Sequence, residues 1–254
     1  MTVPKTALVT GAAKRIGRAI AHDLATHGWA VAVHYSDSRD EAEGLVGEIE
    51  QAGGTACAVQ ADLSVEAETS SLTGRVVDAL GPIGCLVNNA STFRHDDADI
   101  ADRTSWDAHM ETNLRAPYVL MHGMARALPE DMNGVIVNML DQRVWNLTPH
   151  FPSYTLSKSG LWTLTRTMAL DLAPRIRVNA IGPGPTLPSP RQTDEQFRSQ
   201  YESLPLRAPV DLQDIAKAVQ FILSAESMTG QMIALDGGQH LAWAHPYESS
   251  ESCE

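Results

Sequence analysis

The strongest constraint on this chain is a regular alternation of short apolar runs with longer stretches of helical spacing. Runs that are apolar at consecutive positions are typical of strands buried on both faces of a sheet. Strands that alternate with helices predict right-handed βαβ units, and therefore an α/β fold with a doubly wound, seven-stranded parallel sheet. The predicted strands are 7–10, 30–35, 55–60, 85–88, 135–140, 177–181 and 231–235, and the predicted helices are about 15–28, 38–52, 64–80, 102–127, 152–173 and 211–225.

Length and charge exclude several classes of function. The 254 residues are expected to form a single domain over 1–242, and the net charge of −12 argues against a nucleic-acid or anionic-membrane partner. No apolar run reaches the roughly 18 residues of a membrane span, and the first run leaves no room for a signal peptide before the fold. Three cysteines without metal-ligand spacing and nine scattered histidines predict a cytoplasmic protein without a metal.

Two polar segments stand apart from the alternation. Proline and glycine open a segment at about 183–206, directly after a predicted strand, where open α/β sheets bind ligands. Both a lid and a plain surface loop remain open for this insert. The polar, acidic tail 243–254 is expected to fray or to pack on a neighbouring subunit.

A glycine turn joins the first predicted strand to its helix. Gly11 and Gly17 flank this turn, whose backbone N–H groups and helix N-terminus suit a pyrophosphate. Lys14 and Arg15 place two cations at that helix N-terminus, where they oppose the helix dipole. An anion supplied by a ligand explains them better than a solvated pair does.

The end of the second predicted strand bears on the choice of dinucleotide. A site that prefers NAD carries an acidic residue there, which bonds the ribose 2′-hydroxyl and would repel a 2′-phosphate. This chain has Tyr35 at that place, which favours NADPH, whereas Asp37 argues in the other direction.

Three motifs in order resemble the short-chain dehydrogenase/reductase family, which has a Rossmann-type fold. They are Thr10-Gly11 with Gly17, Asn88-Asn89-Ala90, and Tyr154 with Lys158, and the resemblance extends to Asp236-Gly237-Gly238. One departure is Arg15, which stands where the family usually has a glycine. The resemblance implies cofactor contacts from Gly11, Lys14, Arg15, Ile16, Gly17, His34, Tyr35, Ser36, Asp62, Leu63, Asn89, Ala90, Tyr154, Lys158, Pro183 and Gly184.

Tyr154 and Lys158 form the predicted catalytic pair. They are four residues apart in a predicted helix and therefore share one face. A nearby ammonium favours the phenolate, so we expect Lys158 to lower the pKa of Tyr154 toward the range useful for acid–base catalysis. The resemblance also implies that Asn113 positions a water in the proton relay.

Asp141 departs from the family pattern in a way that bears on the substrate. Most members have a serine at this place, and its hydroxyl bonds a substrate carbonyl. An ionised carboxylate only accepts hydrogen bonds and would repel a ketone oxygen that gains negative charge. Asp141 therefore favours a nitrogen heterocycle whose C=N bond is reduced, although loss of the serine in an inert protein is an alternative.

A subgroup shares this substitution. Together with the Lys14-Arg15 pair and His34-Tyr35, it resembles the pteridine reductases and the dihydromonapterin reductases. This resemblance implies a homotetramer that uses NADPH to reduce dihydropteridines, with Arg15, Ser91, Phe93, Asp141 and Tyr154 around a pterin-like substrate. The alternatives are a carbonyl reductase for 3-oxoacyl or sugar substrates, and a dinucleotide-binding regulator without turnover.

Overall fold

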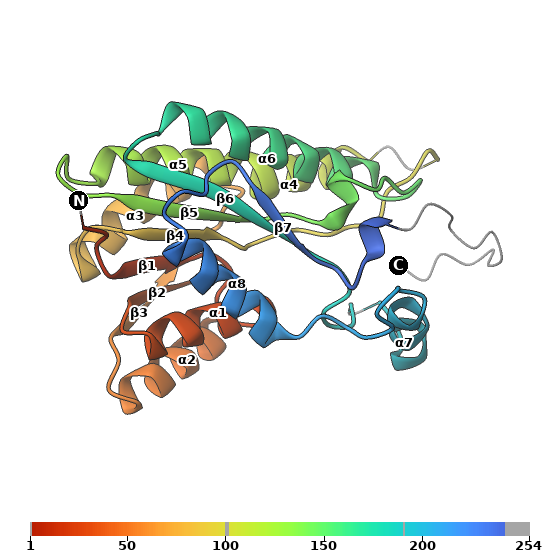
Figure 1. Ribbon diagram of the computed structural model, residues 1–254, viewed down its shortest axis with the longest axis horizontal. Coiled ribbons are helices and arrows are strands. Elements are labelled where there is room, and N and C mark those ends of the chain that lie inside the picture. The colour runs from red at the N-terminus through yellow and green to blue at the C-terminus, as the bar shows by residue number, and fades with distance from the viewer. Residues whose placement is uncertain (1, 100–101, 190, 242–254) are drawn as a thin grey trace.

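The structure is a computed structural model, and it describes residues 2–99, 102–189 and 191–241. The tail predicted at 243–254 lies outside the described residues. Seven parallel strands form one sheet in the order β3-β2-β1-β4-β5-β6-β7, as predicted for a single-domain Rossmann-type fold (Figure 1). The strands are β1 Thr6–Val9, β2 Ala30–Tyr35, β3 Ala56–Gln60, β4 Cys85–Asn88, β5 Gly134–Met139, β6 Ile176–Pro183 and β7 Met232–Leu235.

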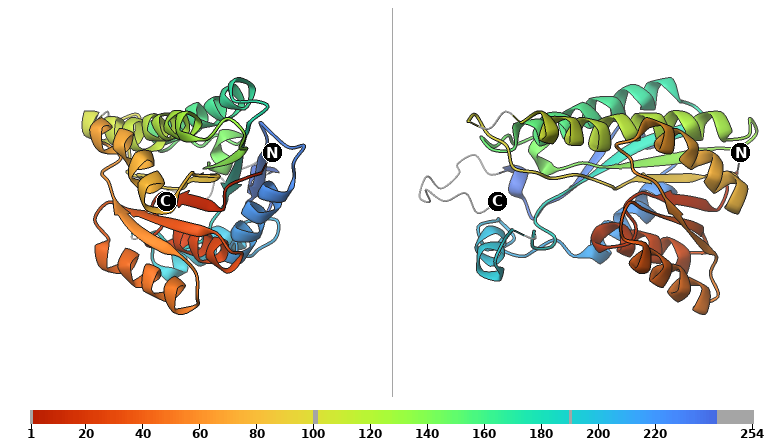
Figure 2. Two further views of the ribbon diagram at one scale, coloured as in Figure 1. Left: turned by 90° about the vertical axis from the view of Figure 1, so that its left-hand side faces the viewer. Right: turned by 180° about the vertical axis from the view of Figure 1, so that it is seen from behind.

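Helices cover both faces of the sheet, as the view from one end and the view from behind also show (Figure 2). The core on one face holds side chains from α1, α2 and α8, and the core on the other face holds side chains from α3, α5 and α6. Every residue of β1, β4 and β5 is buried, which explains their continuous apolar runs. The helices are α1 Arg15–Thr26, α2 Arg39–Gln51, α3 Glu66–Leu80, α4 Arg103–Met110, α5 Ala116–Ala127, α6 Pro152–Asp171, α7 Asp194–Glu202 and α8 Leu212–Ser224, with short 3₁₀ turns at Gln142–Val144 and Gln239–Leu241.

The predicted helix 102–127 is interrupted. A π-helical turn, Glu111–Arg115, separates α4 from α5. Pro117 supplies the reason, because it has no N–H for the carbonyl of Asn113 and its ring crowds that turn. Asn113 consequently lies at an irregular point of the helix.

The insert at 183–206 is partly helical, which the sequence analysis did not predict. Thr193 opens α7 with a capping box, in which its hydroxyl accepts the Gln196 N–H and the Gln196 side chain accepts the Thr193 N–H. Figure 1 shows α7 beyond the end of the sheet toward which the strands run.

The strand order places a ligand crevice at the carboxyl ends of β1 and β4, where the direction of winding reverses. The loops after β1, β4, β5, β6 and β7 all reach this edge. No helix within the described ranges is long and apolar enough to cross a membrane.

Candidate active site

The glycine turn is built so that α1 can approach β4 closely. Gly11 has a φ of +61°, and a Cβ on Gly17 would lie 2.3 Å from the Gly11 carbonyl oxygen and 2.5 Å from Asn89 Nδ2. Asn89 Nδ2 donates to the carbonyls of Thr10 (2.8 Å) and Gly11 (3.1 Å). The N-terminus of α1 has no side-chain cap and no acidic residue in its first turn, so its N–H groups suit an anionic ligand.

His34 holds the turn from the other side. Its Nδ1 accepts the Gly11 N–H at 3.0 Å, and its Nε2 lies 3.1 Å from the Ala61 carbonyl oxygen. Burial lowers the pKa of His34 to about 4, so the ring is neutral and donates through Nε2. Because both nitrogens are engaged within the protein, His34 positions the turn.

A cavity of about 470 Å³ lies beside the turn. Eleven of the predicted cofactor residues line this cavity. Tyr35 does not line it, because the Tyr35 side chain packs against the core beneath α1 and α2. Lys14 forms an ion pair with Glu41 at 2.6 Å. The cavity is lined by Gly11, Lys14, Arg15, Ile16, Gly17, His34, Ser36, Asp37, Asp62, Leu63, Asn89, Ala90, Ser91, Thr92 and Thr112.

Arg15 links this cavity to a second one. Its φ is +54°, a left-handed conformation that favours glycine, which accounts for the glycine usual at this place. Its guanidinium donates to the carbonyl oxygens of Pro188 (3.0 Å) and Leu187 (3.2 Å) in the insert. Arg15 thus joins the glycine turn to the segment that follows β6.

The second cavity, of about 250 Å³, is lined on one side by residues that directly follow β5. The predicted residues around it are Arg15, Ile16, Phe93, Asp141, Tyr154, Pro183 and Gly184, while Ser91 lines the first cavity instead. The insert supplies further wall residues, so it borders the cavity as either a lid or a fixed loop would. The wall residues that the sequence analysis missed include Gln142, Arg143, Leu187, Ser189, Gln192, Gln200 and Gln239.

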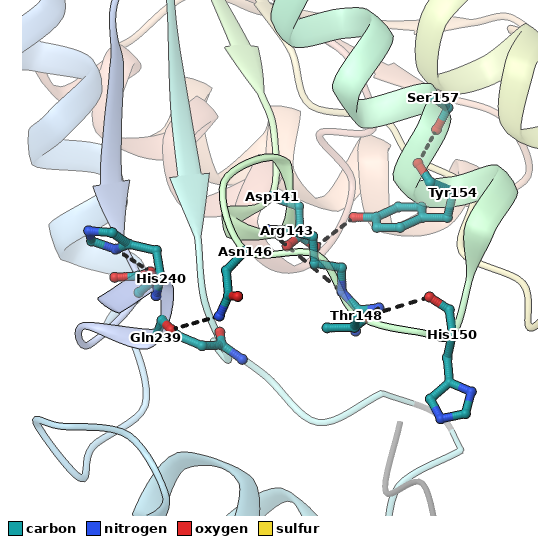
Figure 3. Close-up of polar contacts among 10 residues, drawn as sticks. Asp141, Arg143, Asn146, Thr148, His150, Tyr154, Ser157, Gln239 and His240 are labelled. Atoms are coloured by element: carbon teal, nitrogen blue, oxygen red, sulfur yellow. Dashed lines mark hydrogen bonds and ion pairs between the residues drawn. The ribbon is translucent and has the colours of Figure 1, made fainter. Parts of the chain in front are cut away.

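Asp141 and Tyr154 meet in this second cavity (Figure 3). The Tyr154 hydroxyl donates to Asp141 Oδ2 at 3.1 Å, and Asp141 Oδ1 accepts the Arg143 N–H at 2.9 Å. Burial, followed by the Asp141 charge, raises the pKa of Tyr154 well above its usual value. The phenol is therefore held in its protonated form.

The expectation that Lys158 lowers the pKa of Tyr154 is wrong for this arrangement. Lys158 Nζ donates to the Met139 carbonyl oxygen at 2.9 Å, and burial lowers the pKa of Lys158 to about 8. Among the neighbouring charges, the carboxylate of Asp141 has the largest effect on Tyr154, and it destabilises the phenolate.

Asn113 is buried and holds the segment that follows β4. Its Oδ1 accepts the Thr92 N–H at 2.7 Å, and its Nδ2 donates to the Thr92 carbonyl oxygen (2.9 Å) and to Ser157 Oγ (3.1 Å). The side-chain amide is therefore engaged by protein groups, and a water in the relay would have to be placed by other atoms.

Phe93 forms an aromatic wall of the second cavity. Its ring stacks on Phe151, with centroids 4.5 Å apart, and meets the Tyr154 ring edge-on at 4.7 Å. Arg143, whose side chain is almost fully buried, lies over the Phe151 ring at 5.1 Å and donates to Thr148 Oγ1 at 2.9 Å. Arg143 is thus part of the same wall.

The turn after β7 supplies Gln239. The Asp236 carboxylate accepts the N–H groups of Gly238 (3.0 Å) and His240 (2.8 Å), and Asn146 Nδ2 donates to the Gln239 carbonyl oxygen (3.4 Å; Figure 3). Its position after a predicted parallel strand was a signal that could have placed Gln239 at this edge. The described residues contain no group of three or more histidine, cysteine or acidic side chains able to hold a metal ion.

Comparison with known proteins decides the family. A family model described as enoyl-(acyl carrier protein) reductase matches residues 11–240. The chain belongs to the short-chain dehydrogenase/reductase family. Within this family, it is 34% identical over 242 residues to the 3-oxoacyl-[acyl-carrier-protein] reductase FabG of Staphylococcus epidermidis, covering 93% of this chain and 99% of that protein.

Two solved structures of the family are more similar in sequence. The FolM alternative dihydrofolate reductase 1 of Brucella suis, in complex with NADP, is 52% identical, with a TM-score of 0.93 over 97% of this chain and 99% of that one. Its counterpart from Brucella canis, also with NADP, is 50% identical, with a TM-score of 0.90 over 96% and 98%. The family assignment therefore agrees with the motifs, and the relatives divide between two substrate classes.

Proposed function

We propose that this protein is an NADPH-dependent reductase of dihydropteridines, which it converts to tetrahydropteridines. The observation that carries the proposal is the hydrogen bond between the Tyr154 hydroxyl and the Asp141 carboxylate, 3.1 Å long, in the second cavity. The likeness to the two Brucella FolM alternative dihydrofolate reductases, at 50% and 52% identity, supports the same substrate class.

The residues around the first cavity fit a dinucleotide. The uncapped N-terminus of α1 and the close approach at Gly17 suit a pyrophosphate, and Lys14 and Arg15 supply positive charge for a 2′-phosphate. When bound, NADPH supplies the hydride that reduces a ring carbon. Lys158, next to Tyr154 on α6, is the side chain proposed to hold the nicotinamide ribose.

The second cavity supplies the proton and the orientation. An ionised Asp141 accepts hydrogen bonds from the N–H groups of a pteridine ring, and it has no hydrogen to offer a ketone oxygen. The protonated Tyr154 delivers its proton to the ring nitrogen of the C=N bond, so that nitrogen gains H⁺ while the carbon gains hydride. Phe93 gives the bicyclic ring an aromatic surface, Arg15 lines both cavities, and Ser91 lines the first.

A carbonyl reductase is the second candidate. The identity of 34% to a 3-oxoacyl-[acyl-carrier-protein] reductase over nearly the whole chain favours it, as does the tyrosine–lysine pair. Asp141 disfavours it, because a carboxylate beside the developing oxyanion raises the energy of the transition state. The third alternative, a dinucleotide-binding regulator, does not need a tyrosine that lines a second cavity and is hydrogen-bonded to a carboxylate.

The experiment follows NADPH absorbance with purified protein and a substrate panel. We expect turnover of 7,8-dihydropteridines, such as dihydromonapterin, dihydrobiopterin or dihydrofolate, and little or none of 3-oxoacyl thioesters or sugar ketones. Turnover of ketones alone would overturn the proposal in favour of the second candidate. Cofactor binding without turnover of any substrate would favour the regulator.

The family resemblance extends the proposal to a cytoplasmic homotetramer. Exposed aromatic side chains support a subunit contact, since Trp106 on α4 is 43% exposed and Tyr118 on α5 is 41% exposed. Sedimentation equilibrium of the purified protein tests the oligomeric state, and a monomer would contradict this part of the proposal.

A further inference from the structure

His109 lies directly behind the active site. It lies in the last turn of α4, is fully buried, and its ring meets the Tyr154 ring edge-on with centroids 5.8 Å apart. Its Nε2 accepts the backbone N–H of Arg94 at 2.9 Å, and its Nδ1 lies 2.6 Å from Ser153 Oγ. Because Nε2 accepts a proton donor, the neutral ring carries its hydrogen on Nδ1 and donates it to Ser153.

Two further hydrogen bonds join the segment 92–96, which contains Arg94, to the start of α6. The Ser153 N–H donates to Asp96 Oδ2 at 3.1 Å, and the Asp96 carbonyl oxygen accepts the Phe151 N–H at 2.9 Å. Residues 92–96 form neither helix nor strand, so these side-chain contacts hold the backbone in place of a ladder of regular hydrogen bonds.

Phe93 directly precedes Arg94, the residue that His109 holds. Its ring contacts Phe151 and Tyr154, and its carbonyl oxygen accepts Arg191 Nη2 at 2.6 Å from the insert. The next N–H along the chain, that of Arg94, is the group bound by His109. The position of the aromatic wall therefore depends on the hydrogen bond between Arg94 and His109.

We propose that His109 is a positioning residue that fixes Phe93 against the substrate by accepting the Arg94 N–H. The effect on substrate rests on the proposed function, whereas the effect on the backbone does not. Without the hydrogen bond, the backbone between Phe93 and Arg94 must be ordered when substrate binds, and that cost weakens binding. His109 lines neither cavity, so we expect the loss of this hydrogen bond to leave NADPH affinity and kcat close to those of wild type.

Two substitutions distinguish the hydrogen bond made by His109 Nε2 from the one made by His109 Nδ1. His109→Gln places an amide near the Nε2 position and keeps an acceptor for the Arg94 N–H. His109→Asn places its amide near the Nδ1 position, which keeps the Ser153 contact and loses the Arg94 contact. Both variants are neutral and polar, so each is a control for the other.

The test measures amide hydrogen exchange over residues 91–97, KM and kcat for the reduced substrate, and Kd for NADPH. For His109→Asn we expect exchange at Arg94 to accelerate about tenfold or more. We also expect KM to rise about fivefold, with kcat and the Kd for NADPH within twofold of wild type. His109→Gln is expected to stay close to wild type in all four measurements.

Two results would overturn the proposal. One is unchanged exchange at Arg94 in His109→Asn, and the other is equal acceleration in both variants, which would indicate a general packing role. If the wild-type enzyme reduces no dihydropteridine, the proposed function fails, while the exchange measurement still decides whether His109 anchors Arg94.

Discussion

At the scale of single residues, burial of Lys158 and Tyr154 away from water determines the pKa values of these two side chains at the site. Lys158 is buried and its ammonium contacts the Met139 carbonyl, and Tyr154 is buried beside the Asp141 carboxylate. Burial of a charged form costs free energy, so the pKa of Lys158 falls and the pKa of Tyr154 rises. These shifts keep the proton on Tyr154, as the proposed proton transfer to a substrate nitrogen requires.

The pKa of Lys158 makes a prediction about stability. Its folded pKa of about 8 lies below the usual value of 10.5, so between these values the unfolded chain binds the proton more tightly. The free energy of unfolding of wild type, relative to Lys158→Met, should therefore rise by about 1 kcal/mol from pH 8 to pH 9. Denaturant unfolding measures this difference.

The exposed Lys217 on α8 is the control for that measurement. Its pKa is raised by Asp214, so Lys217→Met should show no such pH dependence between pH 8 and pH 9. A difference between wild type and Lys158→Met that stays flat or falls over this range would show that Lys158 is not desolvated as described.

The sequence predicted that Asp141 and Tyr154 lie at one site, but it did not predict the direction in which the pKa of Tyr154 is shifted. Asp141 follows a strand and Tyr154 opens the next helix, so their meeting at one edge of a parallel sheet could be predicted. The proximity of Lys158 to the Met139 carbonyl could not, because side-chain burial depends on how α6 packs. The role of His34 depends likewise on the Gly11 and Ala61 backbone, which no motif reveals.

At the scale of elements, the glycine turn depends on one close approach. Gly17 lies in the first part of α1, where the helix passes against the Gly11 carbonyl and the Asn89 side chain. A Cβ added at Gly17 would collide with the backbone carbonyl of Gly11, and no movement of a flexible side chain can relieve that contact. The glycine turn and α1 would therefore have to move apart.

Gly17→Ala should therefore lower the melting temperature and reduce NADPH affinity at least tenfold, since the turn that faces the pyrophosphate is displaced. Gly44→Ala is the matched control, because Gly44 lies exposed in α2 and a Cβ there meets nothing within 4 Å. That variant should gain about 0.5–1 kcal/mol in stability and bind NADPH normally. Normal NADPH binding by Gly17→Ala would contradict the account of the turn.

Two elements were missed for identifiable reasons. Thr193 and Gln196 have the spacing of a capping box, but the surrounding prolines and glycines suggested a loop without a helix. Pro117 was a signal for a break in the predicted helix 102–127, and apolar periodicity on either side concealed it. Hydrophobic pattern thus locates long elements well, whereas local backbone irregularities depend on single residues.

At the scale of the whole molecule, the protein is acidic, yet two of its basic residues lie together at the cavity proposed to bind the cofactor phosphates. The net charge is −12, yet Lys14 and Arg15 line the first cavity together with Asp37. The average charge therefore says little about the ligand, and Asp37 opposes the two cations locally.

Asp37→Asn should strengthen NADPH binding about two- to fivefold at low ionic strength, and less at high salt, because one repulsive charge is removed. Affinity for NADH should change less, since it lacks the 2′-phosphate. Asp171→Asn, at the far end of α6, makes the same change in net charge and should leave both affinities unaltered. An equal gain in Asp171→Asn, or none in Asp37→Asn, would show that Asp37 does not face the phosphate.

We propose above all that Asp141 selects a ring nitrogen over a carbonyl oxygen. The measurement that tests it most directly is the ratio of kcat/KM for a 7,8-dihydropteridine to kcat/KM for a 3-oxoacyl thioester, in wild type and in Asp141→Ser. We expect the ratio to favour the dihydropteridine in wild type and to fall about 100-fold or more in the variant, because a hydroxyl can donate to a carbonyl and a carboxylate cannot. An unchanged ratio, or a wild-type ratio that favours the thioester, would contradict it.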